Sequence, residues 1–169
     1  MHYNRPMPSN RTVPHLPAAA QRPSGCTCSR LRRLTRRLTA IYDHALAPSG
    51  LRVTQYSLLS FLQGPRTATL TALADALDLE RTSLTRNLRP LVDAGWVALE
   101  PGADARSRVA RLTARGAAKW AQAQPLWRAA QDEVNAKLGA AEVVKLHAQI
   151  DHYLPQLRPA TNGEQEELP

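Results

Sequence analysis

The segment from Asp78 to Trp96 combines residue types that could contact a polyanion. A helical period of about 100° per residue places its leucines on one face and a row of hydroxyl and guanidinium groups on the other. The outward row consists of Thr82, Ser83, Arg86 and Arg89. No acidic residue lies between Arg81 and Val92, so this face could approach phosphates and base edges without repulsion. Taken alone, the segment is equally consistent with an ordinary solvated amphipathic helix.

A second candidate site follows in a predicted β-hairpin, with strands over 96–99 and 108–112. Arg106 lies near its tip and Arg108 at the start of the returning strand. A thin hairpin tip suits a narrow minor groove, whose negative potential attracts guanidinium groups. We expect Asp104 to pair with a nearby arginine and to shape the tip, because a carboxylate facing phosphate would weaken binding.

Helical periodicity and capping residues predict the elements that position these two sites. Ser29, Thr54, Thr71 and Thr113 are the predicted N-caps. Further helices are predicted over 29–47, 54–62, 72–77, 114–138 and 141–157. Pro125 predicts a kink or break in the longest of them, and Pro90 a small kink near the end of the opening segment. A short helix, a tight turn, a polar-faced helix and a hairpin together make a winged helix-turn-helix.

The predicted fold class is therefore mainly α with a small β-hairpin wing, and the chain divides into three regions. Residues 1–25 form a basic, proline-rich N-terminal arm, 26–158 the folded domain, and 159–169 a flexible acidic tail. Within the domain we expect a DNA-binding lobe at 54–113 and dimerisation helices at 29–47 and 114–157. These helices carry more apolar surface than one small winged domain needs, which favours packing against a second copy.

Charge and composition narrow the class of protein. The two termini carry three arginines and three glutamates, so the domain accounts for the whole net charge of +8. A basic domain favours an anionic partner such as double-stranded DNA. No apolar run is long enough to span a membrane, and we expect a cytoplasmic protein. The sequence contains no glycine-rich phosphate loop, nucleophile elbow or His-Glu-x-x-His motif, so we predict neither an enzyme nor a cofactor.

The two cysteines, Cys26 and Cys28, directly precede the first predicted helix. A helix N-terminus lowers a thiol pKa, so a redox switch through a bond to the partner subunit's cysteines is one hypothesis, and inert thiols are the other. A zinc site that combines this pair with His44, or with His147 and His152, lacks the usual ligand spacing, and we predict no metal.

Three segments resemble the MarR family of bacterial transcriptional regulators. They are Leu73-Ala74-Asp75-Ala76-Leu77, then Leu84-Thr85-Arg86-Asn87-Leu88, and the run from Asp104 to Gly116 with its Asp-x-Arg and Leu-Thr-x-x-Gly patterns. The resemblance covers roughly residues 26–158. It implies a homodimer with interleaved first and last helices that binds a pseudo-palindromic promoter site, most often as a repressor.

The resemblance also implies roles for individual residues. Arg86 is expected to contact guanine or an adjacent phosphate, Thr82 and Ser83 base edges or phosphates, and Arg89 the DNA backbone. The full expected DNA-binding set is Arg81, Thr82, Ser83, Arg86, Asn87, Arg89, Arg106 and Arg108.

Members of the family often hold a small aromatic acid between the dimerisation helices and the DNA-binding lobe. By position, the implied effector site comprises Tyr42, His44, Gln55, Tyr56 and Trp120. The alternative is that the three aromatic residues are core and His44 is surface. Two other functions also remain open: a thiol-based redox regulator, and an architectural DNA-binding protein without sequence preference.

Overall fold

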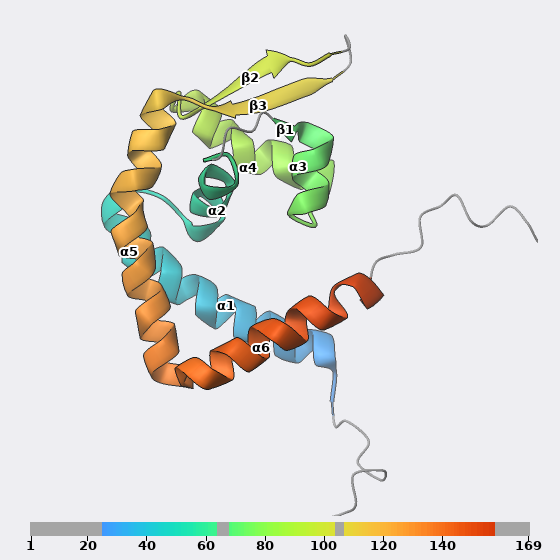
Figure 1. Ribbon diagram of the computed structural model, residues 1–169, viewed down its shortest axis with the longest axis vertical. Coiled ribbons are helices and arrows are strands. Elements are labelled where there is room, and N and C mark those ends of the chain that lie inside the picture. Colours follow the sequence, from blue (N-terminus) through green and yellow to red (C-terminus); the bar gives the residue numbers. More distant parts are fainter. Residues whose placement is uncertain (1–24, 64–67, 104–106, 158–169) are drawn as a thin grey trace, which may run out of the picture.

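The computed structural model describes residues 25–63, 68–103 and 107–157. The chain has the shape of a C in which one long helix, α5 (Ala114–Leu138), connects a winged lobe to a helical arm (Figure 1). Both predicted tails lie almost entirely outside the described residues, and so do Asp104 and Arg106.

The arm is built from helices alone. It comprises α1 (Thr27–Leu46), the C-terminal half of α5, α6 (Ala140–Tyr153) and the short 3-10 helix η3 (Pro155–Leu157). α1 packs along α5, and Gly139, at φ 86°, allows the sharp turn between α5 and α6.

The winged lobe follows α1 through the 3-10 turn η2 (Ala47–Ser49). It contains α2 (Val53–Phe61), β1 (Ala68–Thr69), α3 (Leu70–Ala76), α4 (Arg81–Asp93), β2 (Val97–Pro101) and β3 (Arg108–Leu112). The three strands form an antiparallel sheet in the order β1-β3-β2. The predicted mainly helical fold with a hairpin wing is confirmed.

The hydrophobic core lies in the lobe and is completed by Leu46 of α1 and Ala123 of α5. The predicted inward face of α4 is confirmed, since Leu84, Leu88 and Leu91 are at most 2% exposed. The largest fully buried side chains are Leu46, Leu58, Leu59, Leu62, Leu73, Leu84, Leu88 and Leu91. They come from the end of α1, from α2 and its C-cap Leu62, and from α3 and α4, so the core fixes the orientation of α4 relative to its neighbours.

Two of the predicted N-caps are wrong, because both residues lie inside their helices. Ser29 lies inside α1, which begins at Thr27 without a side-chain cap. Thr54 lies inside α2, where Asp43 Oδ1 accepts the Val53 N–H (2.7 Å) and Gln55 Oε1 accepts the Arg52 N–H (2.9 Å). Asp43 belongs to α1, so a side chain of the arm caps the first helix of the lobe.

The other two caps differ in outcome. The cap of α3 is Thr69 rather than Thr71, since Thr69 Oγ1 accepts the Ala72 N–H (3.1 Å). The cap of α5 is Thr113 as predicted, with Oγ1 accepting the Gly116 N–H (3.0 Å). Thr69 and Thr71 both satisfy the sequence rule for an N-cap, which asks for a threonine three positions before a free backbone amide. The sequence alone therefore did not decide between them.

The internal prolines do not divide their helices. α5 continues through Pro125, so the predicted break does not occur, and α4 continues through Pro90 to Asp93 as expected. The last predicted helix is shorter than expected, because α6 ends at Tyr153 and the chain enters η3.

Candidate nucleic-acid interface

A tight turn joins α3 to α4 and sets the angle between them. Asp78 adopts φ 47°, a left-handed conformation that aspartate tolerates better than most residues, and the Leu79 N–H reaches back to the Ala74 carbonyl (2.9 Å). Leu73 and Ala74 on α3 and Leu84 on α4 are buried in one core. The turn and the shared core therefore hold α4 as the second helix of a helix-turn-helix.

The outer face of α4 carries the predicted polar row. Arg81, Thr82, Arg86 and Arg89 are exposed, while Ser83 and Asn87 are half-buried. Among the described residues Arg81 and Arg86 form no ion pair. Arg89 is within 3.8 Å of Asp93, but both side chains are exposed, so this pair holds Arg89 only weakly. The guanidinium groups of α4 are thus available to an external anion.

The wing lies beside α4 at the end of the molecule away from α6 (Figure 1). Arg108 is exposed and pairs in register with Pro101 across the two strands. The predicted tip residues Arg106 and Asp104 lie outside the described residues, so their predicted roles stay predictions.

A different ion pair joins the two strands of the wing. Arg111 donates to Glu100 Oε1 from Nε (2.9 Å) and from Nη2 (2.6 Å). The hydrogen bond and the charge of Arg111 lower the pKa of Glu100, and Glu100 in turn raises the pKa of Arg111. Sequence reasoning missed this pair, although opposite charges on neighbouring strands are a recognisable signal once the register is known.

The junction of wing and long helix depends on one threonine and one glycine. The Thr113 hydroxyl lies 2.8 Å from the Gly95 carbonyl and 3.2 Å from that of Trp96, while its oxygen caps α5. Gly116 is buried against the Trp96 carbonyl, and a Cβ there would overlap it. The hairpin is therefore held against α5 by the segment 112–116, through the hydrogen bonds of Thr113 and the close packing of Gly116.

The predicted effector residues separate into two groups. Tyr42, Tyr56 and Trp120 form an aromatic cluster with Trp127. Tyr56 stacks on Trp127 at 5.7 Å and on Trp120 at 6.5 Å between ring centroids, and Tyr42 lies 6.4 Å from Trp127. His44 is exposed, and Gln55 is used at the start of α2.

Polar atoms of the aromatic cluster already have partners within the chain. The Tyr42 hydroxyl donates to Gln131 Oε1 (2.7 Å), and Trp120 Nε1 donates to Ser60 Oγ (2.8 Å). Burial raises the pKa of Tyr42. Sequence reasoning missed Trp127, Gln131 and Ser60; the spacing of Trp120 and Trp127, seven residues apart on one helix face, is the signal that was available.

The cysteines are exposed free thiols at the start of α1, with Cys26 at the N-cap position. Cys28 lines a groove of about 520 Å³ together with Leu31 and Leu157. In the described part of the chain, no three His, Cys, Asp or Glu side chains come together in an arrangement that could hold a metal ion. No helix of that part is long and apolar enough to cross a membrane.

The helix-turn-helix, the antiparallel wing and the flanking long helices define a winged helix-turn-helix protein. A model of the MarR family matches residues 49–107. The Mycobacterium tuberculosis transcriptional regulator MosR, solved in complex with DNA, is 40% identical, with 80% of this chain and 100% of MosR covered and a TM-score of 0.70. The chain belongs to the MarR family.

Two further DNA complexes have the same fold. A mutant of Escherichia coli MarR bound to operator DNA is 28% identical, covering 75% of this chain and 93% of that one, with a TM-score of 0.68. The transcriptional repressor CouR bound to a DNA duplex is 25% identical, covering 75% of this chain and 91% of that one, also with a TM-score of 0.68. The matched structures are named as transcriptional regulators and not as enzymes.

Proposed function

We propose that the protein is a sequence-specific, DNA-binding transcriptional repressor that occupies a pseudo-palindromic promoter site as a homodimer in the cytoplasm. The observation that carries this proposal is the exposed polar and basic face of α4 beside the wing, which contains no acidic residue from Arg81 to Val92. The similarity to MosR, MarR and CouR, each solved with DNA, supports it.

Within this proposal α4 enters the major groove and the wing lies over the adjacent minor groove. Arg86 reads guanine or clamps the phosphate beside it, and Thr82 and Ser83 contact base edges or phosphates. Arg81, Asn87, Arg89 and Arg108 hold the DNA backbone, and Arg106 reaches into the minor groove.

The distribution of exposed apolar side chains supports the homodimer. All the large hydrophobic side chains found exposed among the described residues belong to the arm: Leu31, Leu138, Val144, Ile150, Tyr153, Leu154 and Leu157. Apolar surface gathered on one part of a water-soluble domain is typical of a protein interface. A two-fold dimer places two copies of α4 on one side, which is the geometry that a palindromic site requires.

The aromatic cluster is the proposed effector site, and it lies where α1, α2 and α5 meet. An aromatic acid would have to displace the Tyr42–Gln131 or the Trp120–Ser60 hydrogen bond, and this would shift α5 relative to α2. Asp43, which caps α2 from α1, lies one residue from Tyr42 and provides a mechanical link from the cluster to the lobe. Release from DNA then follows from a changed distance between the two copies of α4.

Titration of DNA affinity tests the role of α4. Arg86→Ala should reduce specific binding by about 1–3 kcal/mol and relax base preference at one position of each half-site. Arg128→Ala is the control, since Arg128 is also an exposed arginine but lies on α5 and not on α4. Fluorescence anisotropy on an operator selected in vitro measures both. Unchanged affinity of the Arg86 variant would refute the assigned role.

Competition with unrelated DNA distinguishes a specific regulator from an architectural protein. A regulator keeps its footprint on the selected site in a large excess of random duplex, whereas an architectural protein is titrated away in proportion to mass. Loss of the footprint at modest excess would favour the architectural protein.

Calorimetric titration with aromatic carboxylates tests the effector site. Binding should disappear in Trp120→Phe if its indole N–H is needed, while His44→Ala, a change of an exposed residue outside the cluster, should leave it intact. An absence of heat with every carboxylate would leave the aromatic cluster as core alone.

The exposure of both thiols favours thiol-based redox control as a second candidate. Peroxide would accept two electrons and release water as Cys26 or Cys28 joins one of the partner's cysteines in a disulfide. DNA affinity before and after peroxide should then differ in the native protein and not in the Cys26→Ser/Cys28→Ser variant. Identical affinities in the native protein would rule this candidate out.

A further inference from the structure

The first half of α1 is rich in arginine, and the proposed function assigns it no role in DNA binding. Between Cys26 and Tyr42 the sequence contains no acidic residue and five arginines: Arg30, Arg32, Arg33, Arg36 and Arg37. With Asp43 as its one acidic residue, α1 has a net charge of +4. The segment 47–113, which contains the winged lobe, has eight arginines and six acidic residues, a net charge of +2. Positive charge is therefore concentrated on the arm and not on the lobe that carries α4.

The five arginines share one side of α1, which we call the arginine face. At about 100° per residue they fall within an arc of about 160°, and the half-buried Leu34, Leu38 and Ile41 lie outside it. All five arginines are exposed. Four of them form no ion pair with a described residue: Arg32, Arg33, Arg36 and Arg37. The arginine face is therefore available to an external anion.

An extended polyanion fits the arginine face better than a membrane does. Arg30 and Arg37 are seven residues apart, or roughly 10 Å along the helix, and about 10 Å of duplex DNA presents about six negative charges. A helix on a membrane surface needs large apolar side chains beside its basic ones, and this arc contains none larger than alanine. Since the chain belongs to a family of DNA-binding regulators, duplex DNA is the polyanion that it meets at high local concentration.

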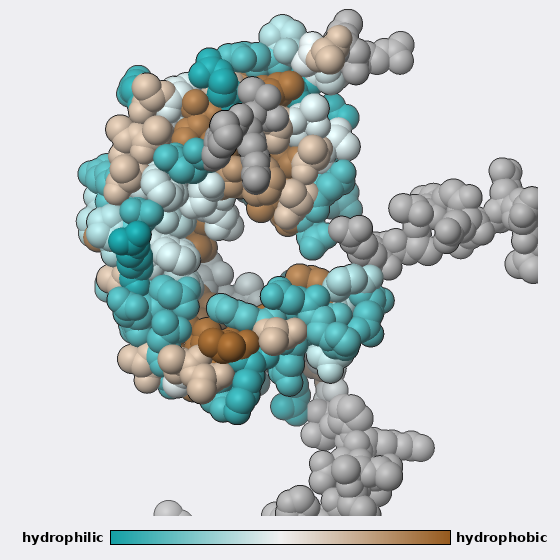
Figure 2. Space-filling model, viewed as in Figure 1, coloured by the Kyte–Doolittle hydropathy of each residue, from teal (hydrophilic) through white to brown (hydrophobic). Residues whose placement is uncertain are grey.

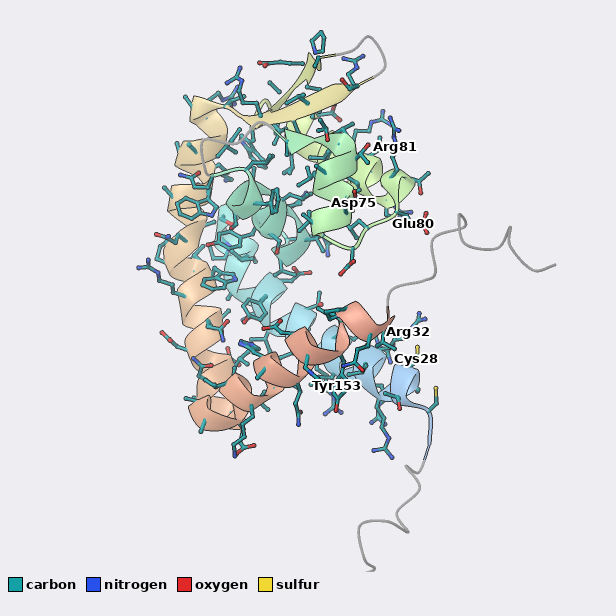
Figure 3. All side chains as sticks on the ribbon, turned by 45° about the vertical axis from the view of Figure 1, so that its right-hand side comes forward. Cys28, Arg32, Asp75, Glu80, Arg81 and Tyr153 are labelled. Carbon is teal, nitrogen blue, oxygen red and sulfur yellow. The ribbon has the colours of Figure 1, made fainter. Side chains whose placement is uncertain are left out.

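The arginine face lies apart from the recognition helix. Arg30 and Arg37 precede Leu46, which enters the core of the lobe, by roughly 24 and 13 Å along α1. The wing and the arm lie at opposite ends of α5 (Figure 1). Figure 2 shows a hollow between lobe and arm, and Figure 3 shows Arg32 on the arm across it from Arg81, the first residue of α4. A duplex on α4 and the wing therefore leaves the arginine face to a different segment of DNA.

We infer that the arginine face of α1 binds the phosphate backbone of a second DNA segment while α4 holds the first. Guanidinium contacts with phosphates hold a duplex without reading its sequence, so the second segment needs no operator. One bound regulator then brings two segments of DNA together. This inference goes beyond the proposed function, because base recognition by α4 does not require a second DNA surface.

Capture of a second duplex tests the inference on the full chain. An operator duplex selected in vitro is immobilised and saturated with protein, and a fluorescent random-sequence duplex is then added. The native protein should capture this duplex with a dissociation constant of about 1–100 μM at physiological salt. The variant Arg33→Gln/Arg36→Gln/Arg37→Gln should weaken capture about ten-fold or more. Its affinity for the operator should stay within about two-fold of the native value, because α4 is unchanged.

A charge-conserving variant separates attraction to phosphate from a structural role of the arginines. Arg33→Lys/Arg36→Lys/Arg37→Lys should retain most of the capture, since lysine also binds phosphate as a point charge. Glutamine and lysine are both good helix formers, so both variants should fold, and helical circular dichroism checks this. Loss of capture in the lysine variant to the level of the glutamine variant would contradict a binding that rests on charge.

A matched control removes the same charge elsewhere in the arm. Arg128→Gln/Lys137→Gln/Lys145→Gln changes exposed residues of α5 and α6 and should weaken capture less than about two-fold. An equal loss in this control would mean that net charge alone attracts the second duplex, and would overturn the inference. Equal capture by the native chain and the glutamine variant would overturn it too, because another surface, such as a second winged lobe, would then hold the duplex.

The salt dependence of native capture counts the phosphate contacts. Three to five contacts should give a slope of roughly 3 to 4.5 in the logarithm of the dissociation constant against that of salt concentration, and a slope near zero would contradict the inference. Absence of capture, with binding to vesicles of anionic phospholipid, would assign the arginine face to a membrane instead. An immobilised random duplex can replace the operator, so a chain without operator preference would contradict the proposed function and still test this inference.

Discussion

The winged lobe and the arm differ in how much of their large apolar side chains is exposed. In the lobe Leu58, Leu73 and Leu84 are at most 1% exposed, and the charged residues of α4 lie outside. In the arm Val144, Tyr153 and Leu157 are more than half exposed. Because burying apolar surface is the main favourable contribution to folding, the lobe, completed by Leu46 of α1 and Ala123 of α5, has a core within one chain. The arm leaves part of its apolar surface exposed.

This difference predicts two kinds of thermodynamic behaviour. Contacts inside the lobe stabilise a single chain, so their loss should not depend on protein concentration. In the proposed homodimer, contacts between the arm and a second copy stabilise only the dimer, so their loss should appear as a change in the dissociation constant. Substitutions in the two regions should therefore differ in how their effects depend on protein concentration.

The largest effect is expected in the core of the lobe. Leu84→Ala should lower the free energy of unfolding by about 2–5 kcal/mol, because Leu84 is 0% exposed and its removal leaves a cavity under α4. Urea denaturation at two protein concentrations measures it, and the loss should be equal at both. A loss that grows on dilution would place Leu84 in the dimer contact instead of the core.

Gly116→Ala should have the next largest effect on the free energy of unfolding, because Gly116 lies where the start of α5 packs against the wing. The added methyl would overlap the Trp96 carbonyl and lie 2.7 Å from Leu112 Cδ1, forcing β2 away from α5 at a cost of about 1–3 kcal/mol. Helix propensity alone predicts the reverse, a gain of about 1 kcal/mol for alanine in a helix. The sign of the change in unfolding free energy thus decides between packing and propensity.

In the arm, Leu157→Ser should weaken the proposed dimer by about 1–2 kcal/mol, since much of this side chain is exposed in the single chain and a second copy is expected to bury it. Sedimentation equilibrium measures the change, and Leu157→Met, which keeps the apolar surface, is the control. The helical circular dichroism should stay unchanged. A comparable loss in the stability of the monomer would contradict this difference between the lobe and the arm.

The same division explains what the sequence predicted well. The face of α4 follows from a period of leucines against one core, and the structure buries Leu84, Leu88 and Leu91 as expected. The bounds of α5 and the Thr113 cap were also predicted correctly, because the cap and its amide lie three residues apart. Local rules succeed where the partners are close in sequence and one candidate fits, whereas Thr71 was wrong because the nearby Thr69 satisfies the same rule.

Predictions failed where a distant residue supplied the contact. Asp43 caps α2 from ten residues away, so the local candidate Thr54 was wrong. Gln131 and Ser60, which satisfy Tyr42 and Trp120, lie 89 and 60 residues from them. Sequence periodicity gives no information on such pairs. The expected effector site stays a prediction, with three of its residues in the aromatic cluster, Gln55 bonded at the start of α2 and His44 exposed.

A smaller effect is expected from a substitution of Thr113, which joins the wing to α5. Thr113→Val should reduce the free energy of unfolding by about 1 kcal/mol, because it removes both the N-cap of α5 and the hydroxyl contact with the Gly95 carbonyl. Thr113→Ser keeps the hydroxyl and should restore most of the loss. Equal losses in the two variants would mean that the methyl group of Thr113, and not its hydrogen bonds, stabilises the junction.

The smallest effect is expected at the exposed Glu100–Arg111 pair of the wing. Since Arg111 lowers the pKa of Glu100 in the folded chain, the pair's contribution is present above the ordinary carboxyl pKa and is lost as pH falls through the lowered value. Glu100→Gln has no such titration, so its difference in melting temperature from the native chain should be largest near neutral pH and should vanish in acid. Amide exchange in β2 and β3 locates the change. A difference that is constant with pH would mean that the carboxylate's charge does not stabilise the wing, and that the strands are held by the lobe's core alone.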